Sequence, residues 1–202
     1  MLEINSYSSS ILHDISFSLK ENENLIILGE NGAGKSTLAK VLSNLISNSN
    51  VKIFGEKINK ISDFQRAKFI NYIPPKLSIF DEYVTLREFL ELSSIDIVNN
   101  ERIDKIISLL KLEKLENRYC KAFSSGEKQL LLLASSIIHD AKITIFDELT
   151  ANLDISRLKE VFDIFSSDLL KQKIIITHNL DLANALKYKI LFIKDGKIEF
   201  FD

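Results

Sequence analysis

The sequence predicts an α/β fold in which a parallel sheet is combined with a small antiparallel β subdomain and an inserted α-helical subdomain. Short apolar runs at residues 25–28, 143–146 and 174–176, of which only the second contains a polar residue, Thr144, have the length and composition of buried strands. Amphipathic stretches with helical spacing separate these runs, and such alternation is typical of a parallel sheet. Residues 2–7 and 15–19 instead alternate apolar and polar side chains, as half-buried antiparallel strands do.

Composition limits the class of protein. The 202 residues are enough for one large domain, or for one domain with an inserted subdomain. The net charge of −2 and the pI near 6.0 give no electrostatic footprint for nucleic acid or anionic lipid. The single cysteine, Cys120, excludes an internal disulfide and suits a reducing cytoplasm. We expect no signal peptide, and the longest apolar stretch, residues 130–138, is too short to cross a membrane.

One glycine-rich segment has a diagnostic form: GENGAGKST at residues 29–37, directly after the apolar run at 25–28. Phosphate-binding loops occur between a strand and a helix, because their backbone N–H groups and the helix dipole face the anion. Lys35 is placed to reach the β- and γ-phosphates, and the Ser36 hydroxyl to ligate Mg²⁺. An ordinary glycine-rich turn is the structural alternative, but the flanking strand and helix favour nucleoside triphosphate binding.

The helix that follows this loop is expected to pack on the sheet through one apolar stripe. The residues of that stripe are Leu38, Val41, Leu42, Leu45 and Ile46. Residues 51–54 and 70–73 are predicted to form two further strands. The second of these ends at Pro74-Pro75, because the residue before a proline is pushed out of helical conformation.

From about residue 75 to residue 125 the sequence changes character and predicts the helical subdomain. Thr85 and Glu88 have the spacing of a capping box that opens a helix. A second apolar stripe follows and consists of Ile103, Ile106, Ile107 and Leu110. The single domain of residues 1–202 is thereby divided into a core with its β subdomain, residues 1–74 and 126–202, and the inserted helices.

The C-terminal part returns to alternating helices and strands. Residues 130–138 and 155–169 are predicted helices, the second with an apolar face of Leu158, Val161, Phe162 and Phe165. Residues 190–193 and 198–201 are predicted to form a hairpin across Asp195-Gly196.

Reactive side chains follow three of the predicted core strands. The phosphate-binding loop follows Leu28, Asp147-Glu148 follow the strand 143–146, and His178 comes two residues after Ile176. Because ligands bind beyond the carboxyl ends of parallel strands, these groups should converge on one site. Asp147 is suited to hold Mg²⁺ through a water, Glu148 to polarise the attacking water, and His178 to contact the γ-phosphate or that water. A helix cap or loop is the alternative for the acidic pair, and a structural role for the histidine.

A second anion site is expected at residues 123–129, FSSGEKQ. Ser124 and Glu127 form a capping box at the start of the helix that contains residues 130–138. A capped helix N-terminus with serine and glycine is suited to bind an anion. The chain therefore has two phosphate-facing helix ends for one triphosphate.

Over nearly its whole length, the chain resembles the ATP-binding subunits of ABC transporters. Residues 29–37 match the Walker A motif, residues 143–148 match Walker B with its catalytic glutamate, and His178 matches the switch histidine. Residues 123–127 match the family signature, usually LSGGQ or LSGGE, and residues 151–154 match the D-loop. The resemblance implies a P-loop nucleoside triphosphatase of RecA-like type that binds ATP and Mg²⁺ and is an ATPase.

The same resemblance implies a head-to-tail dimer in which the signature of one subunit closes on the ATP of the other. It further implies a peripheral position on the cytoplasmic face of the membrane, with transmembrane permease subunits and a second ATP-binding subunit, expected as a homodimer, as partners. No nucleic acid partner is expected. The implied catalytic residues are Glu148 and His178, and the implied Mg²⁺ ligands are Ser36 and Asp147. The implied nucleotide-binding residues, with Tyr7 stacking on adenine, are Tyr7, Gly29, Asn31, Gly32, Ala33, Gly34, Lys35, Ser36, Thr37, Ser124, Ser125, Gly126 and Asp154.

The sequence departs from the family pattern at four positions. Pro75 stands where the family usually has a glutamine that touches Mg²⁺ and senses the membrane subunit, and proline has no side-chain amide. Ser125 replaces a signature glycine, Phe123 replaces a leucine, and Leu149 replaces a proline. Only the first of these puts coupling to the membrane subunit in question.

Two alternatives to a fully active transporter subunit stay open at this point. The first alternative is a non-transport ABC-type ATPase that acts on DNA, ribosomes or protein assemblies. The second is a poorly hydrolysing subunit that pairs with a better one. Relatives of the first kind usually carry two cassettes or a long coiled coil, whereas this chain has one cassette. Among transporters, the run at residues 58–74 resembles importers of iron-siderophores, haem and cobalamin.

Overall fold

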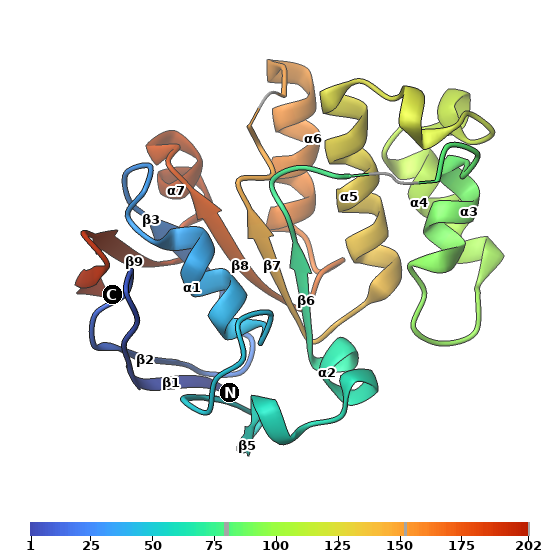
Figure 1. The fold of residues 1–202 in the computed structure, drawn as a ribbon. Coiled ribbons are helices and arrows are strands. Elements are labelled where there is room, and N and C mark those ends of the chain that lie inside the picture. Colours follow the sequence, from blue (N-terminus) through green and yellow to red (C-terminus); the bar gives the residue numbers. More distant parts are fainter. Residues whose placement is uncertain (79–80, 152, 202) are drawn as a thin grey trace.

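The computed structural model describes residues 1–78, 81–151 and 153–201, which form two β-sheets and a set of helices (Figure 1). The strands are β1 (Leu2–Tyr7), β2 (Ile15–Leu19), β3 (Leu25–Leu28), β4 (Val51–Ile53), β5 (Glu56–Lys57), β6 (Ile70–Ile73), β7 (Ile143–Asp147), β8 (Gln172–Thr177), β9 (Lys189–Lys194) and β10 (Lys197–Phe201). The α-helices are α1 (Lys35–Leu42), α2 (Asp63–Phe69), α3 (Leu86–Leu92), α4 (Asn100–Leu109), α5 (Ser125–His139), α6 (Ile155–Ser166) and α7 (Leu180–Leu186). Short 3₁₀ helices are η1 (Ile58–Lys60), η2 (Glu113–Leu115) and η3 (Cys120–Ala122).

The larger sheet has six strands in the order β10-β9-β3-β8-β7-β6. All neighbouring pairs from β9 to β6 are parallel, and β10 alone is antiparallel, to β9. The predicted C-terminal hairpin is confirmed. Its first strand also extends the parallel sheet, by pairing with β3, which the sequence did not indicate.

The smaller sheet is antiparallel and has the order β2-β1-β4-β5. It confirms the predicted β subdomain and the pairing of the first two strands, with Leu2 opposite Leu19. Both of these strands alternate buried and exposed residues over most of their length, so one face of this sheet lies against the core.

Two apolar layers cover the two faces of the large sheet. Along β3, Leu25 and Ile27 point into the layer that contains α1 and the small sheet, whereas Ile26 and Leu28 point into the layer that contains α5 to α7. Every residue of β3 is buried, as expected for a strand covered on both sides. The sheet therefore separates α1 from α5, and this separation matters for the site described below.

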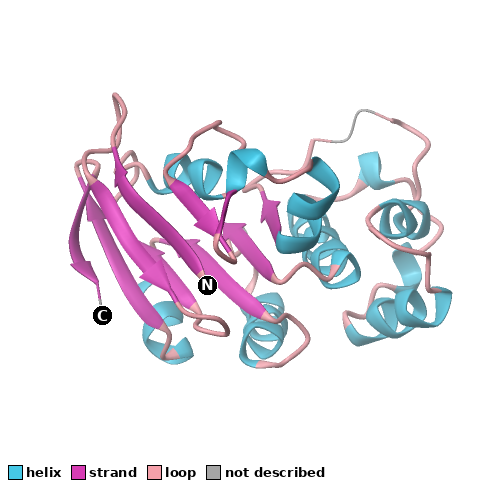
Figure 2. Ribbon diagram, turned by 90° about the horizontal axis from the view of Figure 1, so that it is seen from below, coloured by secondary structure: helices cyan, strands magenta, loops and turns pink. Residues whose placement is uncertain are grey.

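The chain between β6 and α5 folds into helices at one end of the molecule. Figure 2, turned about the horizontal axis of Figure 1, shows the strands on one side and these helices at the other end. The predicted capping box of Thr85 and Glu88 opens α3, and the stripe that includes Ile103, Ile106 and Ile107 is buried in α4. The only strand-like contact described in this segment is a single bridge between Thr85 and Tyr119. The exact division of the chain at about residues 75 and 125 stays a prediction.

Several predicted boundaries were wrong. Helix α1 ends at Leu42, so the predicted apolar stripe extends too far: Leu45 is 63% exposed and Ile46 is 37% exposed. Asn44 takes a positive φ of 60°, and the Asn48 amide caps the helix by donating to the Val41 carbonyl at 2.9 Å. Helix α6 likewise ends three residues before the predicted end at residue 169.

Two short helices were not predicted. Helix α2 has no buried residue, so it carries no apolar stripe, and it depends on the Ser62 side chain, which accepts from the Gln65 N–H. Helix α7 is only seven residues long and is opened by Asn179. Within residues 1–78, 81–151 and 153–201, no helix combines the length and the apolar character needed to span a bilayer.

The β9–β10 turn supports the phosphate-binding loop from behind. Gly196 N–H donates to the Ala33 carbonyl at 3.2 Å, and its own carbonyl accepts from the His13 N–H at 2.8 Å. Gly196 has a φ of 73°, and a Cβ at this position would lie 1.9 Å from the Ile11 carbonyl oxygen. The close approach of two backbones therefore requires glycine here.

We predict that Gly196→Ala lowers the free energy of unfolding by about 2 kcal/mol or more, through both the backbone conformation and the contact with Ile11. Gly55→Ala is the matched control. It has a similar φ of 88° but would place its Cβ in open space, so about 1 kcal/mol is expected. Urea unfolding of the three proteins measures the difference. Equal losses in the two variants would show that the contact with Ile11 has no weight.

Candidate nucleotide-binding site

The three strand ends predicted to converge do so. Strands β3, β8 and β7 are adjacent and parallel, with Leu28 opposite Thr177 and Ile176 opposite Asp147. Each strand therefore ends at the same edge of the sheet, toward which their arrows point in Figure 1. The loop at residues 29–34, the Asp147-Glu148 pair and His178 all follow these ends.

The loop after β3 is shaped by glycines at two positions. A Cβ on Gly29 would lie 2.2 Å from the Ile193 carbonyl oxygen, so only glycine lets the chain leave β3 against β9. Gly34, with a φ of 102°, is the N-cap of α1 and turns the loop into the helix. The first turn of α1 has no acidic residue, so its N-terminal N–H groups are suited to an anion.

Lys35 is the first residue of α1, and its side chain reaches back to the loop. Its side chain is only 6% exposed, and its ammonium donates to the carbonyls of Gly29 at 2.8 Å and Glu30 at 3.0 Å. The same ammonium lies 3.8 Å from Oε1 of Glu148. The positive charge that a triphosphate needs is therefore held at the edge of the sheet by groups that a phosphate can replace.

Asp147 is completely buried and accepts two hydrogen bonds, one on each oxygen. Ser36 Oγ donates to Oδ1 at 3.0 Å, and Tyr72 Oη donates to Oδ2 at 2.8 Å. Burial, and then the bond to Asp147, raise the pKa of the Tyr72 phenol. The juxtaposed hydroxyl and carboxylate oxygens are the hard ligands that Mg²⁺ prefers, so the pair fits this ion.

Among the described residues, no group of three or more histidine, cysteine, aspartate or glutamate side chains is arranged to hold a metal by itself.

Hydrogen bonds hold both the backbone and one carboxylate oxygen of Glu148. Its φ is 53°, unusual for a side-chain-bearing residue, and its N–H donates to the Ile176 carbonyl at 3.0 Å. Oε2 accepts from Nδ1 of His178 at 2.9 Å. Oε1 is buried, and no group in the described part of the chain donates a hydrogen bond to it. A buried carboxylate oxygen of this kind is available to accept from a water.

Tyr7 is the last residue of β1. Its side chain is only 8% exposed and packs in the apolar layer of α1 and the small sheet. The stacking of Tyr7 on adenine stays a prediction. Asn31, in contrast, lies exposed on the loop.

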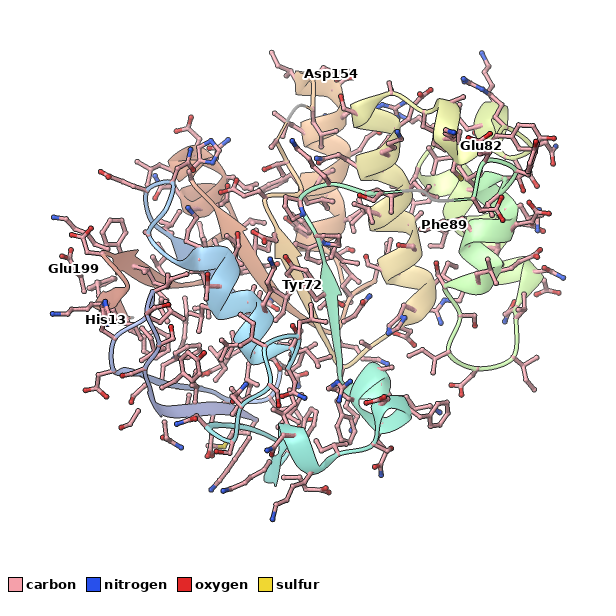
Figure 3. All side chains as sticks on the ribbon, in the orientation of Figure 1. His13, Tyr72, Glu82, Phe89, Asp154 and Glu199 are labelled. Carbon is pink, nitrogen blue, oxygen red and sulfur yellow. The ribbon has the colours of Figure 1, made fainter. Side chains whose placement is uncertain are left out.

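Asp154 is the N-cap of α6 (Figure 3). It accepts from the N–H of Arg157 at 2.9 Å and from the Ser156 hydroxyl at 2.7 Å. Its carboxylate therefore already has local partners. Asn152, in the predicted D-loop, lies outside the described residues.

The predicted capping box of the signature is confirmed. Ser124 N–H donates to Oε2 of Glu127 at 2.8 Å, while the Ser124 hydroxyl accepts from the Glu127 N–H at 3.3 Å. Oε1 of Glu127 lies 3.6 Å from Arg118, whose guanidinium also lies over the Phe123 ring. The bond from the Ser124 N–H holds the pKa of Glu127 below its ordinary value. None of the described contacts joins this box to Lys35 or Asp147, in agreement with the separation of α5 and α1 by the sheet.

The four departures from the family pattern have different surroundings. The carbonyl of Pro75 accepts from the Gln129 amide, Nε2, at 3.3 Å, beside a cavity of about 260 Å³ that Ser125 also lines. Phe123 and Leu149 are buried in the apolar layer of α5, so both are packing residues.

Tyr72 and Gln129 were missed by the sequence analysis. The sequence indicates the two strands, but the contact of Tyr72 with Asp147 follows only from the register of β6 against β7.

Comparison with known proteins agrees with this geometry. Residues 12–151 match the model of the ABC transporter family. An uncharacterized ABC transporter ATP-binding protein of Methanocaldococcus jannaschii is 33% identical, over 95% of this chain and 79% of its own. A phosphonates import ATP-binding protein of Fusobacterium nucleatum is 29% identical, over 95% of this chain and 85% of its own. Other relatives are longer, and the chain spans 28% of a lactococcin transport/processing protein of Lactococcus lactis.

Solved structures show the same fold. A dimeric ATP-binding cassette in a post-hydrolysis state, bound to ADP and phosphate, has a TM-score of 0.83 at 21% identity and covers 100% of this chain and 98% of its own. The cbiO1 protein of Clostridium perfringens, part of the ABC transporter complex cbiONQ, has a TM-score of 0.82 at 21% identity, over 99% and 87% of the two chains.

The chain belongs to the ABC transporter family as an ATP-binding cassette, and its enzyme class is that of an ATPase. The fold class predicted from the sequence is confirmed.

We predict that Glu127 makes part of the stability of this fold dependent on pH. Because its folded pKa is lowered, its contribution is complete above the ordinary glutamate pKa and is lost as the pH falls through the folded value. Glu127→Gln keeps the capping geometry without the charge. It should therefore reduce the stability difference between pH 7 and about pH 3.5 by roughly 1 kcal/mol. Urea unfolding at both pH values provides the measurement.

Glu88→Gln, in the matching box of α3, is the comparison for this experiment, since the Thr85 N–H lowers the pKa of Glu88 in the same way. Both variants should change in the same direction. A Glu127→Gln protein with the pH dependence of the native protein would contradict the assignment.

Proposed function

We propose that this chain is the ATP-hydrolysing subunit of an ABC transporter and that two copies close on Mg²⁺-ATP to drive membrane subunits. The observation that carries the proposal is the meeting of Lys35, Ser36, Asp147 and Glu148 at one edge of the sheet, with Ser36 3.0 Å from Asp147 and Lys35 3.8 Å from Glu148. These are the groups that phosphate binding, metal binding and water activation each need.

In this proposal, the loop after β3 and the start of α1 bind the phosphates. The loop amides and the Lys35 ammonium would hold the phosphates, and Lys35 would exchange the carbonyls of Gly29 and Glu30 for phosphate oxygens. Gly32, Gly34 and Thr37 belong to this cradle. Ser36 and Asp147 would hold Mg²⁺, which neutralises charge on the phosphates when bound.

In the same proposal, Glu148 and His178 carry out hydrolysis. A water whose proton is accepted by the Glu148 carboxylate would form the new O–P bond at the γ-phosphorus. The bond between that phosphorus and the bridging oxygen breaks, and ADP leaves with the bridging oxygen. His178 donates to Oε2 and so orients the carboxylate, which leaves the buried Oε1 for the water.

A second copy of the chain supplies a role for the signature. Ser124, Ser125 and Gly126 start α5, on the opposite face of the sheet from α1, so they are not part of the same-chain cradle. In a head-to-tail homodimer, this capped helix end would bind the γ-phosphate of the partner's ATP, with Asp154 near the same interface. The dimeric cassette found in the structural comparison supports this arrangement.

Membrane subunits are the proposed partners, and the cytoplasmic face of the membrane is the proposed location, without nucleic acid. The membership of cbiO1 in a transporter complex supports this assignment. Importers of iron-siderophores, haem or cobalamin remain the finer proposal for the cargo. That proposal rests on residues 58–74 alone, since the relatives above are named for phosphonates and lactococcin.

We predict that Glu148→Gln binds ATP with native affinity but lowers steady-state turnover by about 100-fold or more, because the amide cannot accept the water's proton. Glu160→Gln is the matched control: the two glutamate side chains are 17% and 19% exposed, and Glu160 pairs with Lys111 and Arg157, away from the site. Phosphate release and equilibrium ATP binding are the measurements. Native turnover in Glu148→Gln would remove Glu148 from its role.

Purification from the native cell tests transport against the alternative of a non-transport ATPase. Co-purification with a membrane protein supports the transporter assignment. Co-purification with ribosomes or DNA would contradict it.

A second candidate function follows from Pro75 and Ser125: a subunit with poor hydrolysis, paired with a better one. If this holds, Pro75→Gln should raise ATP turnover severalfold in the presence of the membrane partner, because it restores a side-chain amide. The Gln129 bond is retained in that variant, since its acceptor is the backbone carbonyl. Turnover unchanged by Pro75→Gln would argue against the poorly hydrolysing subunit.

A further inference from the structure

Tyr72 is a polar residue of the site with no role in the scheme above. It lies near the C-terminal end of β6 (Figure 3). Its hydroxyl donates to Oδ2 of Asp147 at 2.8 Å. The side chain is half-buried and packs against the apolar layer that contains α1. The Asp147 carboxylate of β7 is therefore contacted by Tyr72 of β6 through one oxygen and by Ser36 of α1 through the other.

The register of the sheet explains why Tyr72 reaches Asp147. Tyr72 pairs with Ile145 on the neighbouring parallel strand, and Asp147 is two residues further along that strand. Side chains two residues apart on a strand share a face, so Tyr72 and Asp147 are diagonal neighbours on one face of the sheet. Ile73, the next residue, points into the other apolar layer.

The two hydrogen bonds fix the rotation of the Asp147 carboxylate. Oδ1 faces Ser36 of α1, and Oδ2 faces Tyr72 of β6. If the Tyr72 hydroxyl were removed, the buried Oδ2 would lose this donor. The carboxylate would then be free to rotate toward another donor. Groups that hydrogen-bond a metal-binding carboxylate from behind orient it and tune its affinity for the ion.

We propose that Tyr72 is a positioning residue for the metal: its hydroxyl holds the Asp147 carboxylate so that Oδ1 stays directed toward Ser36 and the Mg²⁺ that this pair would bind. The inference rests on the proposed function, in which Ser36 and Asp147 hold that ion. Tyr72 itself is not a ligand in this scheme: its hydroxyl donates to Oδ2 and thereby orients the carboxylate. The chemical requirement is a single hydroxyl, and the ring is needed only for packing.

Tyr72→Phe removes this hydroxyl and keeps the ring. Tyr188→Phe is the matched control, because Tyr188 is also half-buried and its hydroxyl donates to the Phe165 carbonyl, on the helix α6 and away from Asp147. Each protein is titrated with a non-hydrolysable ATP analogue, once in EDTA and once with Mn²⁺ as a paramagnetic substitute for Mg²⁺. Mn²⁺ binding to the protein–analogue complex is followed by electron paramagnetic resonance.

The expected result is an approximately 10-fold loss of Mn²⁺ affinity in Tyr72→Phe, with metal-free analogue binding unchanged and Tyr188→Phe equal to the native protein. Both titrations use the same protein preparation, so a smaller folded fraction affects the two binding curves equally. Mn²⁺ affinity within twofold of native, or an equal loss of metal-free binding, would overturn the role of Tyr72. If the native protein itself binds Mn²⁺ no better with the analogue than without it, the proposed function fails as well, and the two failures are thereby distinguished.

Discussion

The buried carboxylate of Asp147 is the group on which the site depends. It joins α1 through Ser36 and β6 through Tyr72, while its own strand, β7, lies between β6 and β8. A fully buried carboxylate is costly unless both oxygens are paired, and here each has a donor. The same two bonds bring together elements that are 75 and 111 residues from Asp147 in the chain. The contacts that form the site therefore also link distant parts of the core.

A second constraint acts behind the phosphate-binding loop. Gly29 leaves β3 directly against the Ile193 carbonyl, and the Gly196 N–H donates to the Ala33 carbonyl. The C-terminal hairpin thus determines the shape of a loop that is more than 150 residues earlier in the sequence. A loop supported in this way presents its N–H groups in fixed directions, which is what binding of a phosphate without prior rearrangement requires.

Much of the fold could be predicted from the sequence, because its strands are short apolar runs and its main helices have apolar stripes. The same patterns failed where burial did not decide the structure. Leu45 and Ile46 continue the spacing of α1 but lie beyond its end, and α2 buries no residue at all. The cluster of Lys35, Ser36, Asp147 and Glu148 was predictable since each follows a strand end. Tyr72 was not, because its role depends on strand register, and the burial of Tyr7 depends on packing that spacing does not reveal.

The bond from Gln129 to residue 75 has a consequence for how this chain can vary. Its acceptor is a main-chain carbonyl, which every amino acid carries. The hydrogen bond between α5 and the segment after β6 therefore does not depend on which side chain occupies position 75. Substitution at residue 75 can then change the side chain of this segment without removing the hydrogen bond. A proline at position 75 is therefore compatible with an intact hydrogen bond between the segment after β6 and helix α5, which starts at the signature residues.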